Sequence, residues 1–393
     1  MGPGISPLDE ALGLTTSQLS PGVLRRLVHL GADLPFTQAA ARLEELTGVV
    51  TSPATVRRLT EGVGATAVAL EDAEVDRLER EASAPPVAPG RLVLGADGAM
   101  VPLVGGEWAE AKLLSIGAPA PLSGAGQAAA GQQHLSYCAR VADAETFGRQ
   151  ALAEVHRRGV EAAGAVAAVQ DGAPWLQGFV DLHRPDAVRI LDWPHAAQHL
   201  TSVAAVVFGG QTPRAARVAE RLRRWLWEEG PDRVLAVLAG WERACPDRPE
   251  LATAVAYFRE RRVQLAYPAF RAAGWPVGSG ATESGHKQVM QARMKRAGMR
   301  WARSHVNPLL ALRVLECNGR WAAECPPLLR QHAQRTRAAR RRQPGLGPPV
   351  LAEQPAAAPA PPPVPAPPTR LPAAPSPFRH PWRAYGTRLS AKL

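Results

Sequence analysis

The sequence has few cysteines and no long apolar run, and each shortage excludes a class of protein. The four cysteines, Cys138, Cys245, Cys317 and Cys325, are scattered and form no CxxC pair. This spacing argues against a disulfide framework or a cysteine zinc site. No uninterrupted apolar stretch approaches the roughly 20 residues that span a bilayer. The first residues also lack the basic region and apolar run of a signal peptide, so we expect a cytoplasmic protein.

Acidic residues are scarce in one segment. Positions 271–305 contain a single acid, Glu283, among seven cations. These cations are Arg271, Lys287, Arg293, Lys295, Arg296, Arg300 and Arg303. A carboxylate is a good ligand for a hard metal ion, whereas clustered cations attract an anionic polymer. The segment therefore points to chemistry on nucleic acid.

The formal net charge of +11 is unevenly distributed. From Pro326 onward, eleven Lys or Arg residues stand against one acid, Glu353, which leaves about +1 for residues 1–325. A nucleic-acid surface in this nearly neutral body has to come from local clusters. Residues 326–393 form a basic tail rich in Pro and Ala, with stretches such as PAAAPAPPPVPAPP. Such a composition buries no core, so we expect this tail to be disordered.

Residues 1–81 predict a helical region. The candidate helices span Pro21–Leu30, Thr37–Thr47 and Pro53–Thr60. Gly48 stops the second, and Ser52 is a good N-cap for the third. A helix, a short turn and a helix that carries Arg57 and Arg58 are compatible with helix-turn-helix DNA binding, with a plain helical packing unit as the alternative. ASAPPVAPG, residues 82–90, is a predicted linker.

Strand and helix signals alternate over residues 91–192, which predicts a mixed α/β sheet. The candidate strands are Leu92–Ala96 with Ala99–Leu103, Glu107–Ile116, His134–Val141, Ala165–Val169 and Val188–Leu191, and the candidate helices are Ala144–Arg158 and one starting at Ala173. Residues 193–270 are almost wholly helical in pattern and contain four tryptophans. We expect them to form an all-helical insertion before a final core segment, residues 271–325, that carries Glu283.

Asp97 and Asp171 are both predicted at the end of an apolar strand, each followed by glycine. A strand end places a side chain at the rim of the sheet, and glycine lets the chain turn there. Either aspartate alone is typical of an acidic turn. Together with Glu283, they would form an oxygen-only site suited to Mg²⁺ or Mn²⁺. Two such ions about 4 Å apart activate an attacking hydroxyl and stabilise the leaving oxygen of a phosphodiester.

Four motifs, LGADGAMV, AVQDGAPW, ILDWPHAAQHL and PVGSGATESGHKQVMQARMKRAGMRW, occur in this order. They resemble bacterial DDE insertion-sequence transposases, nearest to the ISKra type and related to the Mutator-like set, from about Leu8 to Trp321. The resemblance implies an RNase H-like core interrupted by a helical insertion. It also implies metal-dependent cleavage at transposon ends and attack of a 3′-hydroxyl on target DNA. It places Asp97, Asp171 and Glu283 on the catalytic triad, as ligands of two Mg²⁺ or Mn²⁺ ions.

The implied partner is double-stranded DNA, comprising the terminal inverted repeats and the target, bound by a homodimer or larger multimer at the bacterial nucleoid. The candidate DNA-binding residues are Lys287, Arg293, Lys295, Arg296, Arg300, Arg57 and Arg58. At 100° per residue, Arg293, Arg296 and Arg300 form a ridge that tracks phosphates or, as the alternative, faces solvent. On the same helix, we expect Glu283, Lys287, Met290, Met294 and Trp301 to share the face that docks on the sheet.

Asp192 and His195 match the family's D-x-x-H signature. His195 and His199 are spaced as in the HExxH zinc motif, but position 196 is Ala196, so a zinc peptidase is not expected. We expect Asp192 and His195 to brace the site or to touch DNA, with a buried hydrogen-bonded pair as the alternative. Two rival functions remain open: an inactive or domesticated transposase-derived DNA-binding protein, and a nuclease of the same fold without strand transfer.

Overall fold

The structure is a computed structural model that describes residues 19–120 and 131–342, all within one compact unit. The described chain is a mixed α/β protein with a five-stranded sheet and many helices, as the alternating pattern predicted. The part of the predicted tail beyond Arg342 lies outside the described residues, as do the predictions for the stretch before Leu19. Among the described helices, none combines the length and the apolar character that crossing a membrane requires.

From Leu19 to Glu81, the described N-terminal residues form three helices. They are α2 (Pro21–Asp33), α3 (Phe36–Thr47) and α4 (Pro53–Glu81). The Ser52 hydroxyl accepts a hydrogen bond from the Thr55 N–H at 3.1 Å, which confirms the predicted N-cap. Gly48 ends α3 with a φ of 69°, the left-handed conformation that glycine adopts freely. α4 continues past the predicted end at Thr60 because it packs against α14 and α5 along the way.

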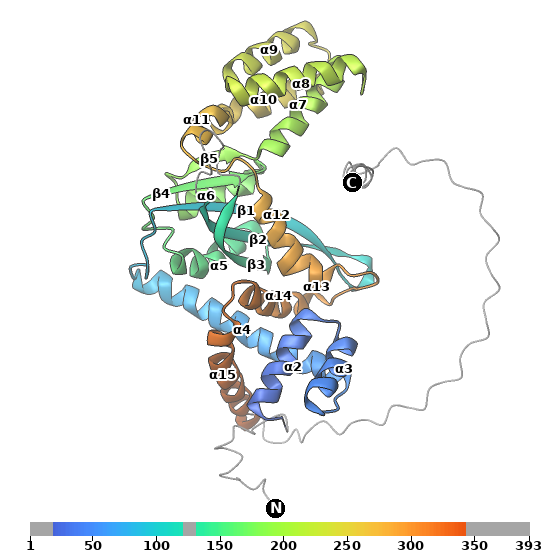
Figure 1. Ribbon diagram of the computed structural model, residues 1–393, viewed down its shortest axis with the longest axis vertical. Helices are drawn as coiled ribbons and strands as arrows, with labels where there is room; N and C mark the ends of the chain where they lie inside the picture. Colours follow the sequence, from blue (N-terminus) through green and yellow to red (C-terminus); the bar gives the residue numbers. More distant parts are fainter. Residues whose placement is uncertain (1–18, 121–130, 343–393) are drawn as a thin grey trace, which may run out of the picture. The chain divides into compact units, whose positions relative to one another are not determined.

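The sheet combines an antiparallel and a parallel part. Its strands are β1 (Arg91–Pro102), β2 (Trp108–Pro119), β3 (Gln132–Val141), β4 (Ala165–Gln170) and β5 (Val188–Leu191). The strand order is β3-β2-β1-β4-β5, in which β1, β2 and β3 are antiparallel and β4 and β5 run parallel to β1 (Figure 1). The predicted stop at Asp97-Gly98 is wrong. β1 continues because its ladder with β2 pairs Asp97 with Leu113, and this pairing overrides the local turn preference of Asp-Gly.

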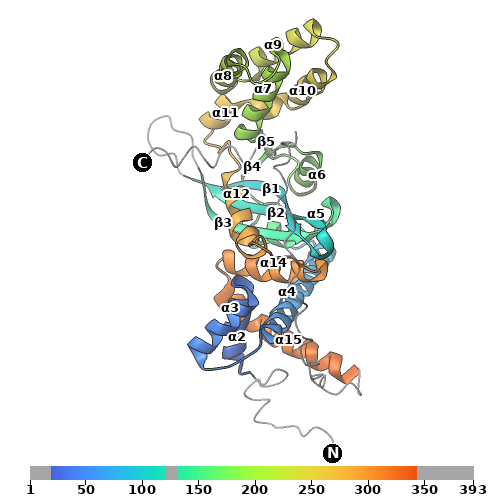
Figure 2. The same cartoon turned by 90° about the vertical axis from the view of Figure 1, so that its right-hand side faces the viewer.

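Side chains along β1 alternate between two cores. Leu92 and Leu94 are buried in a core shared with α5 (Ala144–Arg157) and α6 (Pro174–His183). Val101 is buried on the other side, in a core shared with α14 (Arg303–Cys317). Figure 2 shows α12 on one side of the sheet and α5 and α6 on the other. The odd-numbered residues of β1, Asp97 among them, therefore face the side that carries α12 and α14.

The stretch between β5 and α12 is helical, as its pattern predicted. Its helices are α7 (Trp193–Val207), α8 (Pro213–Glu228), α9 (Pro231–Ala244), α10 (Pro249–Glu260) and α11 (Tyr267–Ala272). α7, α8, α9 and α10 each pack on the next, and α10 packs back on α7, which closes a four-helix bundle (Figure 1). The apolar core of the bundle continues into the sheet, since Leu222 and Phe258 share one buried cluster with Val169 and Ile190.

The chain after the insertion is less regular than predicted. α12 (Gly280–Gly285) passes into a π-helical segment, His286–Gln291, and then into the short α13 (Ala292–Met294). The helix therefore ends at Met294 and does not reach Trp301, contrary to the prediction. Met290, Met294 and Trp301 are buried together against the sheet, as predicted. The predicted five-residue face is otherwise wrong, because Glu283 and Lys287 are exposed and Trp301 lies beyond the end of the helix.

The last described helix, α15 (Trp321–Arg342), corrects the predicted start of the disordered tail. Residues 326–342 are helical. Cys325, Leu328 and Leu329 are buried in one core with residues of α2 and α4, and this burial fixes the start of the helix despite its two prolines. The composition of the segment predicted disorder because its apolar residues are few, but these few have a surface to bury against.

Candidate active site

Two of the three candidate acids stand level with each other beside adjacent strands. In the parallel pair β1–β4, Leu94 is opposite Ala168, and Asp97 and Asp171 each follow three residues later. β4 ends at Gln170, so Asp171 begins the turn that leaves the sheet, as predicted. Asp97 lies within β1, three residues past the last pair with β4, and its side chain is 47% exposed. The two aspartates thus occupy matching positions just beyond the last paired residues of β1 and β4.

The insertion holds the turn that carries Asp171. The Tyr257 hydroxyl donates a hydrogen bond to the Asp171 carbonyl oxygen at 2.9 Å, and the Arg261 guanidinium donates to the Gly172 carbonyl oxygen at 2.9 Å. Gly172 has a φ of +85°, and a Cβ there would lie 2.8 Å from Nε of Arg261 and 2.9 Å from the Tyr257 hydroxyl. Glycine is therefore required by both the backbone conformation and the close approach. Tyr257 and Arg261 are site residues that sequence reasoning missed.

Two side chains, those of His199 and Arg261, stack on the Tyr257 ring. The centre of the His199 ring lies 4.3 Å from the centre of the Tyr257 ring, and the Arg261 guanidinium lies 4.0 Å from the centre of the Tyr257 ring. Burial, together with the nearby charges of His195 and Arg261, lowers the pKa of His199. His199 therefore packs on Tyr257, a role that neither the zinc motif nor the signature predicted.

Asp192 directly follows the next strand, β5. The β4–β5 register places it level with Asp171. Asp192 is only 2% exposed, and its two oxygens accept hydrogen bonds from the backbone N–H of His195 at 3.1 Å and of Ser279 at 2.7 Å. Burial raises the pKa of Asp192, and these hydrogen bonds oppose that rise. Asp192 thus caps α7 and ties it to the segment that leads into α12. The His195 side chain is 39% exposed, and its Nδ1 atom lies 3.8 Å from Oδ2 of Asp192. The role of the two residues in the site stays a prediction.

Glu283 lies on α12, which sits directly on the sheet. The Thr282 hydroxyl is 2.8 Å from the Ser115 hydroxyl of β2. A Cβ at Gly95 of β1 would lie 2.1 Å from the Thr282 hydroxyl oxygen, so the missing side chain at Gly95 makes room for the helix. Glu283 itself is exposed. The strand that carries Asp97 and the helix that carries Glu283 are therefore in direct contact.

His286 connects the Glu283 helix to Asp97. Its Nε2 atom is 3.4 Å from Oδ2 of Asp97, and the residue is 4% exposed. Neither ring nitrogen of His286 has a hydrogen-bond partner within the described chain. Glu283 and His286 are three residues apart, which places them on one side of the helix. That spacing was the available signal for this residue, and sequence reasoning missed it.

The donor chemistry of the three acids fits a hard divalent cation, but their side chains do not form a complete ligand set. Carboxylate oxygens are the ligands that Mg²⁺ and Mn²⁺ favour. Within residues 19–120 and 131–342, no group of three or more His, Cys, Asp or Glu side chains is placed to hold a metal ion. Asp97 and Asp171 each accept a hydrogen bond from a local N–H, that of Gly98 and that of Ala173. The convergence of Asp97, Asp171 and Glu283 on shared ions stays a prediction.

The predicted arginine ridge is wrong because Arg293 points into the protein. Arg293 is 1% exposed, and its guanidinium lies 4.7 Å from the Phe36 ring and 4.8 Å from the Trp301 ring. It also donates to the Gly31 carbonyl oxygen at 3.2 and 3.3 Å. Burial lowers its pKa to about 10. Since the helix ends at Met294, Arg293 shares no helical face with the cations that follow it.

The other predicted DNA-binding residues are exposed. Lys287 is exposed on the π-helical segment, one turn beyond Glu283. Lys295, Arg296 and Arg300 are exposed in the loop between α13 and α14. Arg57 and Arg58 are exposed in the first turns of α4, in the helix that follows the α3–α4 turn. These six side chains remain candidates for contact with DNA.

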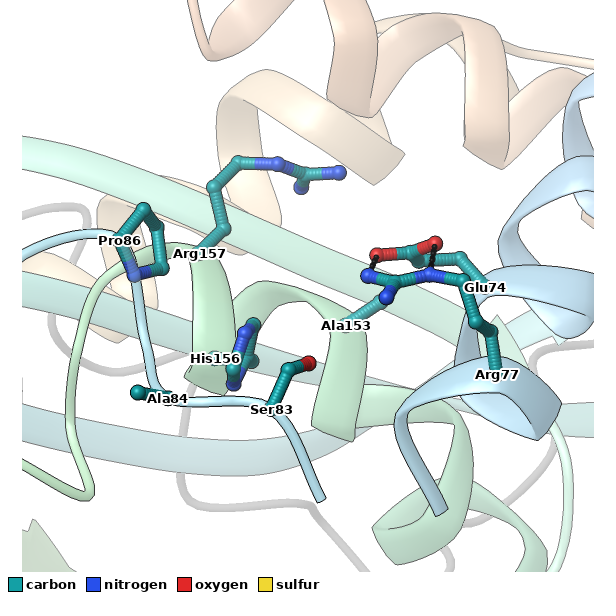
Figure 3. A pocket seen from close by; sticks show the side chains of 8 residues that line it. All are labelled: Glu74, Arg77, Ser83, Ala84, Pro86, Ala153, His156 and Arg157. Atoms are coloured by element: carbon teal, nitrogen blue, oxygen red, sulfur yellow. Dashed lines mark hydrogen bonds and ion pairs between the residues drawn. The ribbon is translucent and has the colours of Figure 1, made fainter. Parts of the chain in front are cut away.

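A cavity of about 380 Å³ includes none of these residues. Figure 3 shows that the end of α4, the linker after it and α5 supply its lining. Its charged groups are already paired: Arg77 binds Glu74 and Glu81, and Arg157 binds Glu154. The candidate site is therefore separate from this cavity.

A scan against protein-family models and a search of curated proteins both find no match for the chain.

Proposed function

We propose that this chain is a DNA transposase of the DDE type, which cleaves DNA at insertion-sequence ends and joins 3′-hydroxyl ends to target DNA. The observation that carries the proposal is the common level of Asp97 and Asp171 on adjacent parallel strands, with the helix of Glu283 lying on the Asp97 face. An acid from each of three separate elements at one end of a sheet is what the sequence resemblance implies for this family.

The sheet order supports an RNase H-like core for this chain. The order β3-β2-β1-β4-β5 joins an antiparallel meander to two parallel strands, and the candidate acids follow β4 and lie on β1. The long gap between Asp171 and Glu283 is occupied by the four-helix bundle. A helical insertion at this position, between the second and third acids, is the arrangement that the motif order implies.

The protein's own residues have separate tasks in this proposal. Asp97, Asp171 and Glu283 would hold two divalent cations, which supply an activated hydroxyl and charge stabilisation for the leaving oxygen. Tyr257 and Arg261 fix the turn of Asp171 through its backbone. Asp192 accepts a hydrogen bond from the backbone N–H of Ser279, the residue before α12, and so holds the start of the helix that carries Glu283. These contacts give the acids a rigid support.

The backbone of bound DNA would lie along exposed cations close to the acids. Lys287 follows Glu283 by four residues and is exposed on the same side of the chain's helical segment. The exposed first turns of α4, with Arg57 and Arg58, would contact the transposon end in the manner of a helix-turn-helix. Its predecessor α3 and the turn between them are both present in the structure.

An assay of the purified chain with Mg²⁺ and DNA that carries the ends flanking the gene tests the proposal. We expect nicked and joined products, and their loss by at least about a thousandfold in Asp97→Asn, Asp171→Asn and Glu283→Gln, because one group of ligands acts as a unit. Asp247→Asn and Glu250→Gln, exposed carboxylates of the insertion, are matched controls that should retain the activity.

The rival functions give different outcomes in this assay. Binding of the ends without cleavage would show a catalytically inactive DNA-binding protein. Cleavage without joining would show a nuclease. Undiminished products in any triad variant would remove that residue from the site.

A further inference from the structure

A second basic surface lies on α8, within the insertion. Four of its arginines recur at intervals of three, four and three residues, the spacing of a single helical face. They are Arg214, Arg217, Arg221 and Arg224, here called the α8 stripe, and all four are exposed. The opposite face of α8 is apolar and buried in the bundle, through Ala215, Ala219, Leu222 and Leu226. The bundle therefore fixes which way the stripe points.

The α8 stripe carries four arginines against one exposed acid on the same face, Glu228. α8 has five arginines and two acids, Glu220 and Glu228. Glu220 forms an ion pair with Arg223, which is not part of the stripe. Among the described residues, no acid forms an ion pair with any of the four stripe arginines. With four arginines to one acid and no ion pair between them, this face is better suited to a polyanion than a solvated face on which the two signs are balanced.

The shape of the stripe fits a duplex backbone. Ten residues of α-helix separate its ends, which is about 15 Å along the axis. The guanidinium groups of Arg214 and Arg221 lie near the Phe208 and Trp225 rings, at 4.8 and 6.0 Å, and these contacts help to orient them. The exposed residues of α8 include no aromatic side chain on which an unpaired base stacks. Because single strands bind largely through such stacking, the stripe is suited to phosphates rather than to bases.

We propose that the α8 stripe binds the phosphate backbone of duplex DNA, as a contact separate from the cations near Glu283. The choice of DNA as the polyanion rests on the proposed function, whereas the existence of a polyanion surface rests on the stripe alone. The insertion would then do two things: it clamps the turn of Asp171 through α10, and it binds DNA through α8.

The test is the salt dependence of binding to a 30-base-pair duplex, measured by fluorescence anisotropy of the full chain without divalent metal. The stripe variant replaces all four arginines by glutamine. The control variant makes the same change at Arg233, Arg243, Arg259 and Arg262, which lie in or beside the same bundle and are exposed or paired with acids. Both variants lower the net charge equally. A third variant, with lysine at the four stripe positions, preserves the charge.

Log affinity decreases with log salt, and each phosphate contact contributes about 0.9 to the steepness of that slope. We expect the slope to become shallower by about 3 to 4 in the stripe variant and by less than about 1 in the control. The lysine variant should retain the wild-type slope. Equal changes in the stripe and control variants, or no change in either, would overturn the proposal. The proposal would also be overturned if the stripe variant bound the DNA duplex as well as the wild type but no longer bound single-stranded RNA. That result would identify RNA as the partner. Since the assay requires no cleavage, a chain that binds through the stripe but cuts nothing would refute the proposed function and leave this inference standing.

Discussion

The two arginine-rich stretches of this chain, α8 and the segment from Lys287 to Arg300, have similar compositions and different environments. In α8 the stripe arginines are all exposed, and the apolar side chains form one opposite face. In the second segment Arg293 is buried between two aromatic rings, while its neighbours Lys295 and Arg296 are exposed. Arginine content and spacing alone therefore do not identify a DNA-binding face.

The difference comes from the partners of each helix. The apolar residues of α8 recur at a regular helical interval, so the bundle can cover only one side of it. Arg293 instead meets Phe36 and the Gly31 carbonyl oxygen, which come from the N-terminal region. These partners are more than two hundred and fifty residues away in sequence, as the 262-residue separation of Gly31 and Arg293 shows. Only the tertiary fold brings them together.

The largest effect on stability is expected on the buried face of α8. Leu222→Ala removes a fully buried side chain from the bundle core, so the free energy of unfolding should fall by about 2–5 kcal/mol. Arg221→Ala, one residue away on the exposed face, should change it by less than about 0.5 kcal/mol. Chemical denaturation of both variants measures the contrast. Similar losses in the two variants would mean that the assigned faces of α8 are wrong.

The second expected effect concerns the buried arginine. Arg293→Ala removes hydrogen bonds to the Gly31 carbonyl oxygen and contacts with two rings, so the free energy of unfolding should fall by about 2–4 kcal/mol. Arg217→Ala in the α8 stripe is the matched control and should be close to neutral. If thermal and chemical denaturation show Arg293→Ala to be as harmless as Arg217→Ala, Arg293 is a surface residue and the predicted ridge is restored.

The smallest expected effect compares Gly95 of β1, which lies against α12, with Gly240 of α9 in the bundle. Gly95→Ala would bring a Cβ within 2.1 Å of the Thr282 hydroxyl oxygen, so α12 has to shift from the sheet at a cost of about 1–3 kcal/mol. Gly240→Ala, in α9 of the bundle, meets no atom within 4 Å and should be neutral or stabilising by up to about 1 kcal/mol. A Gly95→Ala variant as stable as Gly240→Ala would show that α12 does not lie against β1.

Most of the fold was predictable because local patterns and tertiary packing agree. The strands, the helical insertion and the Ser52 cap follow from periodicity and capping chemistry. The stop at Asp97 was wrong because a ladder partner, β2, outweighs a two-residue turn preference. The tail was wrongly predicted to start at residue 326 because three apolar side chains of α15 find a core formed by distant helices.

The site was predictable in part for the same reason. Asp171 is carried by a strand end that the sequence marks with glycine, and the structure places it there. Tyr257 and Arg261 left no signal, because their contacts with the Asp171 turn span more than eighty residues and involve backbone atoms. For His286 and the α8 stripe, the sequence did contain a signal. In both cases the helical spacing was present in the sequence, and the outcome depended on which face the fold covers.

The central claim is that Asp97 and Asp171 serve one metal site, and a calorimetric titration with Mn²⁺ tests it most directly. We expect Asp97→Asn and Asp171→Asn each to weaken Mn²⁺ binding by at least about tenfold. The Mn²⁺ affinity of the double variant should lie within about threefold of that of the weaker-binding single variant, because ligands of one site act together. Wild-type affinity in either single variant, or independent losses that add fully in the double variant, would contradict the account.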